Sequence, residues 1–247
     1  MSDYNRSGVR SIPAGRADVA VDAGLRTFML GVYNKLAAGL ILSAALSWLT
    51  SHEPVINYLF KVTPDGRFAG YTVAGMIVSF APLALVLFGA FSKVSPRSSG
   101  VIYWGVVSAI GASMGAILLV YTGASVASTF FATAAAFGGL SLVGYTTKKD
   151  LSGFGSFLIV GLIGLVIASL VNMFLHSSAM QFIISAIGVL IFAGLIAYDT
   201  QRLKMTYYQL GGDQAAMGVA TNMGALNLYL DFINLFRFLL YFMGNRR

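Results

Sequence analysis

Residues 98–147 read SSGVIYWGVVSAIGASMGAILLVYTGASVASTFFATAAAFGGLSLVGYTT and contain no Asp, Glu, Lys or Arg. A helix needs about 20 apolar residues to cross the roughly 30 Å hydrocarbon core of a bilayer. This run is long enough for two crossings, with a break at Thr122-Gly123-Ala124. The neutral run 151–198 has the same character and breaks at His176-Ser177-Ser178. The chain is therefore predicted to be a polytopic membrane protein.

The composition of the whole chain supports this class. Of the 247 residues, 57% are hydrophobic and only 10% are charged, and the mean hydropathy is +0.78. A soluble domain carries about 25% charged residues, so a cytosolic, disordered or nucleic-acid-binding protein is excluded. The absence of cysteine removes disulfides, thiolate metal sites and thiol nucleophiles. His52-Glu53-Pro54 lacks the second histidine of a zinc protease. The sequence predicts no resident cofactor and no enzyme.

The fold class that follows is an all-α bundle of seven transmembrane helices. Residues 1–30 are predicted to form a cytoplasmic tail with an interfacial helix, because Leu25, Phe28 and Met29 have helical spacing beside Arg26. Residues 31–247 are predicted to form one transmembrane domain. The predicted spans are 32–50, 71–91, 101–121, 125–145, 154–175, 180–202 and 219–242. Gly111 and Gly115, with a row of small neighbours, are predicted to let the third span pack closely against another helix.

The basic residues of the connections predict the orientation. Ten fall on the side of the amino terminus and four on the other, so the amino terminus is predicted to be cytoplasmic under the positive-inside bias. Seven spans then put the carboxyl terminus outside, unless the last segment is re-entrant. The ten are Arg6, Arg10, Arg16, Arg26, Lys93, Arg97, Lys148, Lys149, Arg202 and Lys204; the four are Lys61, Arg67, Arg246 and Arg247.

Four ionisable residues fall within the predicted spans, where each needs a physical reason. Lys35 and Arg237 lie near span ends, so their long side chains are predicted to extend to the headgroups. Asp231 lies about 13 residues into the last span, or about 19 Å from its start, and its short side chain reaches neither surface. It shares a polar stripe with Asn227 and Asn234, which either hydrogen-bond a protonated aspartate or line a path.

Asp199 closes the sixth span, within LIAYDTQRLK (195–204). Taken alone it is equally well explained as an interfacial carboxylate. The sequence GGDQAAMG (211–218) is the best candidate for the turn between the last two spans. Asp199 lies 12 residues before this turn and Asp231 lies 13 residues after it. In an antiparallel hairpin the two side chains are therefore expected at nearly the same depth, provided that the sixth helix continues to about Leu210.

Two carboxylates in contact at low dielectric cannot both ionise easily, so the pair is predicted to share a proton. Asp199 and Asp231 would then act as a pH-sensitive clasp between the last two helices, gating a path lined by Asn227 and Asn234. Carboxylate oxygens are also the ligands that calcium prefers, so both aspartates are candidates for transient calcium contact.

At these residues the chain resembles the Bax inhibitor-1 family, also called the transmembrane Bax inhibitor motif family. The strongest matches are LIAYDTQRLK (195–204) and GALNLYLDFINLF (224–236), and LRTFMLGVYNKLAAGLILS (25–43) is similar to the opening of the family's first span. The resemblance implies seven helices with the last one central. It also implies a pH-sensitive calcium leak controlled by paired aspartates, which map onto Asp199 and Asp231. Some members use an arginine of the second helix as a latch, but residues 71–91 contain no Lys or Arg.

The resemblance favours a bacterial inner membrane, with lipid, calcium and protons as partners. The main alternative is a membrane-integral regulator that binds a membrane protease or another quality-control partner. An intramembrane aspartyl protease is disfavoured because its GxGD motif is replaced by Leu228-Tyr229-Leu230-Asp231. A retinal-binding photoreceptor is excluded because the last span contains no lysine.

Overall fold

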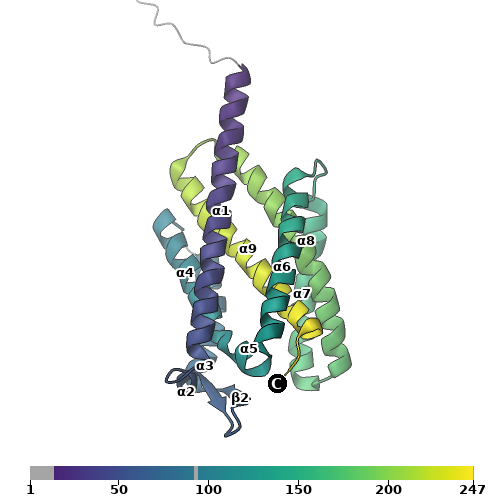
Figure 1. Ribbon diagram of the computed structural model, residues 1–247. Coiled ribbons are helices and arrows are strands. Elements are labelled where there is room, and N and C mark those ends of the chain that lie inside the picture. The colour runs from purple at the N-terminus through teal and green to yellow at the C-terminus, as the bar shows by residue number, and fades with distance from the viewer. Residues whose placement is uncertain (1–13, 92–93, 247) are drawn as a thin grey trace, which may run out of the picture.

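The computed structural model describes residues 14–91 and 94–246 and consists almost entirely of helices that run along one common direction (Figure 1). Arg6, Arg10, Lys93 and Arg247, which entered the charge count above, lie outside the described residues. The elements are α1 (Ala14–Thr50), α2 (Ile56–Leu59), β1 (Phe60–Val62), β2 (Phe68–Tyr71), α3 (Val73–Phe91), α4 (Pro96–Ser113), α5 (Gly115–Val120), α6 (Gly123–Thr146), α7 (Ser152–Leu175), α8 (Ser178–Leu210) and α9 (Gln214–Met243).

Six segments of the described chain are helical, long and apolar enough to cross a membrane: α1 from Asp22, α4 and α5 together, and α6 to α9. The remaining predicted span, 71–91, corresponds to α3, whose apolar stretch is shorter, at Val73–Gly89. Large apolar side chains on α3 and α7, such as Phe80 and Phe157, are exposed. This exposure is expected of helices that face lipid, and the chain is an α-helical membrane protein.

The two breaks predicted inside the neutral runs are confirmed, and local capping explains them. Thr122 is the N-cap of α6, and its side chain accepts a hydrogen bond from the backbone N–H of Ser125. His176 ends α7 in the left-handed conformation, with φ of 50°. Ser177 then caps α8 by accepting from the N–H of Met180. Hydroxyl side chains at N-cap positions satisfy backbone donors that a helix start leaves free.

The close packing predicted for Gly111 is confirmed. A Cβ atom at Gly111 would lie 2.6 Å from Cα of Ser43, so the glycine allows α4 to touch the backbone of α1. Gly144 of α6 does the same against α8, where a Cβ atom would lie 2.1 Å from the carbonyl oxygen of Ala197. Small residues of this kind let helices approach where lipid offers no hydrophobic driving force.

The all-α prediction needs one small correction, because residues 60–71 form an antiparallel hairpin of β1 and β2. Phe60 is almost fully buried there, and its ring packs edge-on against Phe68 and Tyr71. The segment lies at the lower end of the bundle in Figure 1, between α1 and α3. A polar connection between two spans gives no apolar periodicity long enough to predict such short strands.

Helix α9 crosses the bundle diagonally (Figure 1) and packs against α1, α4, α6 and α8. It contributes a large share of the fully buried apolar side chains, including Leu226, Leu228, Tyr229 and Leu235. Helix α3, by contrast, packs mainly against α4. The helix that carries Asp231 therefore has protein on most of its sides.

Candidate functional site

The predicted aspartates are carried by α8 and α9, which form a tight helical hairpin. Helix α8 continues to Leu210, as the register argument requires, and Gly211 and Gly212 then take positive φ values of 56° and 90°. Asp213 caps α9 by accepting from the N–H groups of Ala215 and Ala216 at 2.9 and 3.1 Å. The turn is therefore shorter than the predicted 211–218.

This shorter turn overturns the equal spacing expected from the sequence. Asp199 lies 12 residues before Gly211, whereas Asp231 lies 18 residues after Asp213. The residue count alone therefore does not place the two side chains at the same depth, and α9 runs diagonally across the bundle (Figure 1).

Two close approaches of α8 and α9 bracket the aspartates. At one, Gly224 lies against Leu203, where a Cβ atom would come within 2.3 Å of the leucine Cδ2. At the other, Gly188 lies against the ring of Phe238, where a Cβ atom would come within 2.6 Å. Asp199 and Asp231 lie between these two contacts along their helices, so the backbones around them are held close together.

Asp199 and Asp231 interact electrostatically with each other across the α8–α9 interface. Asp231 is 6% exposed, and its Oδ2 accepts no hydrogen bond from any donor in the described part of the chain. Arg202, one turn farther along α8, interacts electrostatically with Asp199. Two anions cannot donate to each other, so the two carboxyls form a hydrogen bond only when one proton is present.

The two asparagines of the predicted stripe do not satisfy Asp231. Nδ2 of Asn234 donates to the carbonyl oxygen of Leu230 in its own helix at 2.9 Å. Asn227 is half-buried, one turn before Asp231, and makes no side-chain hydrogen bond within the described residues. The alternative of an aspartate held by two asparagines is therefore not what is observed. Asn234 instead lines a cleft between α7, α8 and α9, and Asn227 does not.

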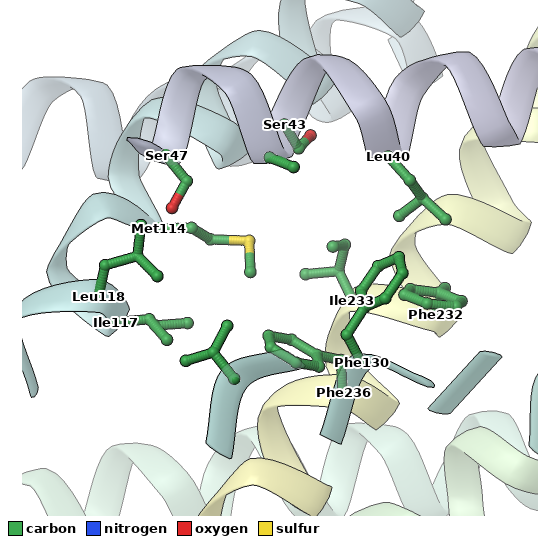
Figure 2. Close-up of a pocket in the computed structure, with 12 residues that line it drawn as sticks. Leu40, Ser43, Ser47, Met114, Ile117, Leu118, Phe130, Phe232, Ile233 and Phe236 are labelled. Atoms are coloured by element: carbon green, nitrogen blue, oxygen red, sulfur yellow. The ribbon is translucent and has the colours of Figure 1, made fainter. Parts of the chain in front are cut away.

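A small apolar cavity of about 130 Å³ lies beside this part of α9 (Figure 2). The cavity is lined by Leu40 and Ser47 of α1 and, opposite them, by Phe232, Ile233 and Phe236 of α9. Asp231 does not line it. Apolar cavities of this kind stay dry, so the cavity offers space for side chains to shift rather than a polar path.

Comparison with known proteins decides the family. The family described as inhibitor of apoptosis-promoting Bax1 matches residues 25–247. The chain belongs to the Bax inhibitor-1 family. An uncharacterized protein of Caulobacter vibrioides is 61% identical over 249 residues, covering 100% of both chains. The inner membrane protein YbhL of Escherichia coli K12 is 41% identical over 236 residues, covering 95% of this chain and 98% of that protein.

The arginine latch of some Bax inhibitor-1 proteins has no counterpart here. Helix α3 carries no basic residue in its described range, and it packs against α4 rather than against α8 or α9. The charge nearest in sequence to Asp199 is Arg202 on the same helix.

Two sets of hydrogen-bonded side chains join the helices around the site, and the sequence predicted neither set. The first involves Lys35, whose predicted extension to the headgroups stays a prediction. Its Nζ donates to Oδ1 of Asn222 and lies 5.5 and 5.9 Å from the ring centroids of Tyr103 and Trp104. Asn222 in turn donates to Oγ of Ser99 at 2.8 Å. The only sequence signal was the presence of a lysine within a span.

The second is a row of hydroxyl groups from three helices, beside Asp199. Tyr33 of α1 is hydrogen-bonded to Ser141 of α6. The oxygens of Ser141 and Thr200 of α8 are 2.9 Å apart, and Thr200 donates to the carbonyl oxygen of Ile196 at 2.8 Å. Thr200 is fully buried. Nothing in the spacing of these residues indicates that they meet.

Proposed function

We propose that this member of the Bax inhibitor-1 family is a pH-sensitive calcium leak, with Asp199 and Asp231 as its sensor. In this proposal seven helices cross the membrane, α9 is the central one, and protons control whether α8 and α9 stay packed. The observation that carries it is the electrostatic interaction of the two carboxyl groups across a helix–helix interface in which Asp231 is buried and its Oδ2 has no hydrogen-bond donor among the described residues.

The packed conformation holds the pair together only while a proton is shared. When both carboxylates are ionised, their mutual repulsion acts at low dielectric and favours separation of α8 from α9. The packed state thus binds the proton more tightly than the separated state. By linkage, raising the pH shifts the population toward the separated state, and we expect the leak to increase with pH.

The packed conformation has the features of a closed state. The ring of Phe232, next to Asp231, packs against Phe130 and Phe137 of α6, with centroids 5.4 and 5.6 Å apart. The cleft that contains Asn234 does not reach Asp231. In the proposal, Asn234 and Asn227 line the path on either side of Asp231 once α9 moves, and the dry cavity beside Phe232 gives its side chains room to do so.

Calcium is the cargo in this proposal rather than a resident metal. Carboxylate oxygens suit calcium, which takes six to eight oxygen ligands when held in a permanent site. No group of three or more His, Asp or Glu residues occurs among the described residues. A pair of aspartates is too few for a permanent site, and this favours brief contact during passage.

The E. coli relative is named an inner membrane protein, and we propose the same location here. The excess of basic residues favours a cytoplasmic amino terminus. Helix α9 runs from one end of the bundle to the other without turning back (Figure 1). Arg246, which pairs with Tyr121 between α5 and α6, then lies on the outer side.

The test is calcium flux into liposomes that contain the purified protein and an enclosed calcium indicator, measured from pH 5 to 8. Wild type is expected to leak more at higher pH. Asp231→Asn is expected to remove the pH response, because an amide is neutral throughout this range. Asp199→Asn should do the same.

Asp213→Asn is the matched control, because it makes the same chemical change at an exposed position where asparagine is an equally good N-cap. It is expected to behave as wild type. An unchanged pH profile in Asp231→Asn would show that the pair is no sensor. Absence of flux at every pH would favour the second candidate function, a regulator that binds a membrane protease or another quality-control partner.

A further inference from the structure

A large cleft of the described chain contains neither of the two aspartates and shares only Asn234 with the site described above. It has a volume of about 830 Å³ and lies between α7, α8 and α9, toward the end of the bundle that carries the carboxyl terminus. Both α7 and α9 pack along α8, while α7 has no extensive contact with α9. Ligand sites in proteins commonly have volumes of about 300–1,000 Å³, so the cleft is large enough for one.

Two arginines from different segments line this cleft. Arg237 lies on α9, six residues before its last residue Met243, or about 9 Å inside the helix end. Arg246 follows the helix. Neither guanidinium has an ion pair or a hydrogen bond with another described residue, and the cleft lining contains no Asp or Glu. The cleft thus carries two permanent positive charges that no described acidic residue pairs with.

Arg246 is held in position by its surroundings. Its guanidinium carbon lies 5.8 Å from the ring centroids of both Tyr121 and Tyr241. Its backbone pairs with Tyr121, and the neighbouring Asn245 accepts from the N–H of Thr122 at 3.0 Å and donates to Oγ of Ser125 at 3.0 Å. These contacts hold the backbone of Asn245 and Arg246 beside the cleft. The position of the arginine is therefore set by its backbone as well as by its side chain.

The rest of the lining is neutral and has two parts. Gln181 bridges the helices around it by accepting from Asn172 at 3.2 Å and donating to Ser185 at 3.3 Å. The remaining walls are mainly apolar and belong largely to α7, a helix with little buried surface. The apolar residues that α7 and α8 contribute are Leu162, Leu165, Val166, Leu170, Met173, Ile184 and Phe192. The cleft is therefore cationic at one part and hydrocarbon-like at another.

We infer that the cleft binds an anionic phospholipid, with the phosphate group between Arg237 and Arg246 and an acyl chain along α7. Guanidinium groups bind phosphate oxygens through paired, charge-assisted hydrogen bonds. A soluble anion would not use the apolar wall, and a zwitterionic lipid such as phosphatidylcholine would place its own quaternary ammonium near the two guanidinium groups, which disfavours it relative to an anionic lipid. This inference does not depend on the proposed leak, because it uses none of the aspartate residues.

The test is native mass spectrometry of the full chain in a neutral detergent, with dioleoyl-phosphatidylglycerol or dioleoyl-phosphatidylcholine added. We expect one phosphatidylglycerol to be retained in preference to phosphatidylcholine. Arg237→Gln and Arg246→Gln are each expected to weaken retention roughly tenfold, since each removes charge-assisted hydrogen bonds. Arg67→Gln is the matched control, because Arg67 is an exposed arginine of the β1–β2 hairpin outside the cleft, and it should retain the lipid as wild type does.

Three results would overturn the inference. Equal retention of the two lipids by wild type would remove the anionic selectivity, and this measurement does not depend on whether a variant folds. Unchanged phosphatidylglycerol binding in a folded variant that combines Arg237→Gln with Arg246→Gln would show that the arginines do not bind the lipid. Displacement of phosphatidylglycerol by millimolar inorganic phosphate would identify a soluble-anion site instead of a lipid site.

Discussion

Asn222 shows how one buried amide can join three helices. Its oxygen accepts from Lys35 of α1, and its nitrogen donates to the carbonyl of Pro96 and to Oγ of Ser99 at the start of α4. The side chain is 7% exposed. Every polar atom of the amide is therefore used, and the connection lies on the same helix as Asp231, about two and a half turns away.

The variant Asn222→Ala is expected to lower the free energy of unfolding by about 1–3 kcal/mol, because it removes the hydrogen bonds that Asn222 makes to the buried hydroxyl of Ser99 and to the partly buried ammonium of Lys35. Unfolding by SDS in mixed micelles measures the change. Asn57→Ala is the control, since Asn57 makes one exposed hydrogen bond to Glu53, and its effect should stay within about 0.5 kcal/mol. Equal effects of the two substitutions would contradict this role of Asn222.

At the scale of the elements, two glycines of α6 can be compared, one that contacts α8 and one whose surroundings are open. Gly144 meets the backbone of Ala197, whereas a Cβ atom at Gly139 would meet nothing within 4 Å. The backbone of α8 cannot yield as the end of a side chain can, so added volume at Gly144 must push the two helices apart.

Gly144→Ala is therefore expected to destabilise the protein by about 1–3 kcal/mol through overpacking. Gly139→Ala is expected to be neutral or slightly stabilising, because alanine favours helix more than glycine does. Thermal unfolding of both variants in the same detergent makes the comparison. The interpretation fails if Gly144→Ala is as stable as Gly139→Ala.

At the scale of the whole molecule, the proposed orientation can be tested with single cysteines, because the chain has none of its own. Asp65 lies in the exposed β1–β2 hairpin and Asp213 in the exposed turn between α8 and α9, at the opposite end of the bundle (Figure 1). In intact spheroplasts, a membrane-impermeant maleimide should label Asp65→Cys and leave Asp213→Cys unlabelled until the cells are lysed. The reverse pattern would invert the proposed topology.

Much of the fold could be predicted because long neutral runs have few alternatives. The breaks at Thr122 and His176 are marked by residues that cap or end helices. The ends of α8 and α9 were harder, since GGDQAAMG is polar and small enough to be read as one long turn, although Gln214 onward is helical. The tilt of α9 cannot be read from the sequence, because it depends on the shapes of the helices that surround it.

The acidic residues of the candidate site could be predicted from the sequence. The polar side chains around them could not. A carboxylate in the middle of an apolar span is costly, so Asp231 stands out in the sequence. Lys35 and Asn222 are 187 residues apart, and each alone has an ordinary explanation at the end of a span. Serine, threonine and tyrosine give still less signal, because a hydroxyl costs little to bury and is common in membrane helices.

The hydrogen bonds that join Tyr33, Ser141 and Thr200 all donate in one direction along the row. Each hydroxyl owns a single proton, and that of Thr200 is already committed to the carbonyl of Ile196. The hydroxyl of Ser141 then donates its hydrogen bond to Thr200, and the hydroxyl of Tyr33 donates to Ser141. Three helices are thus joined by a one-way chain, and it cannot reverse at any link unless the threonine first releases the backbone to which it is anchored.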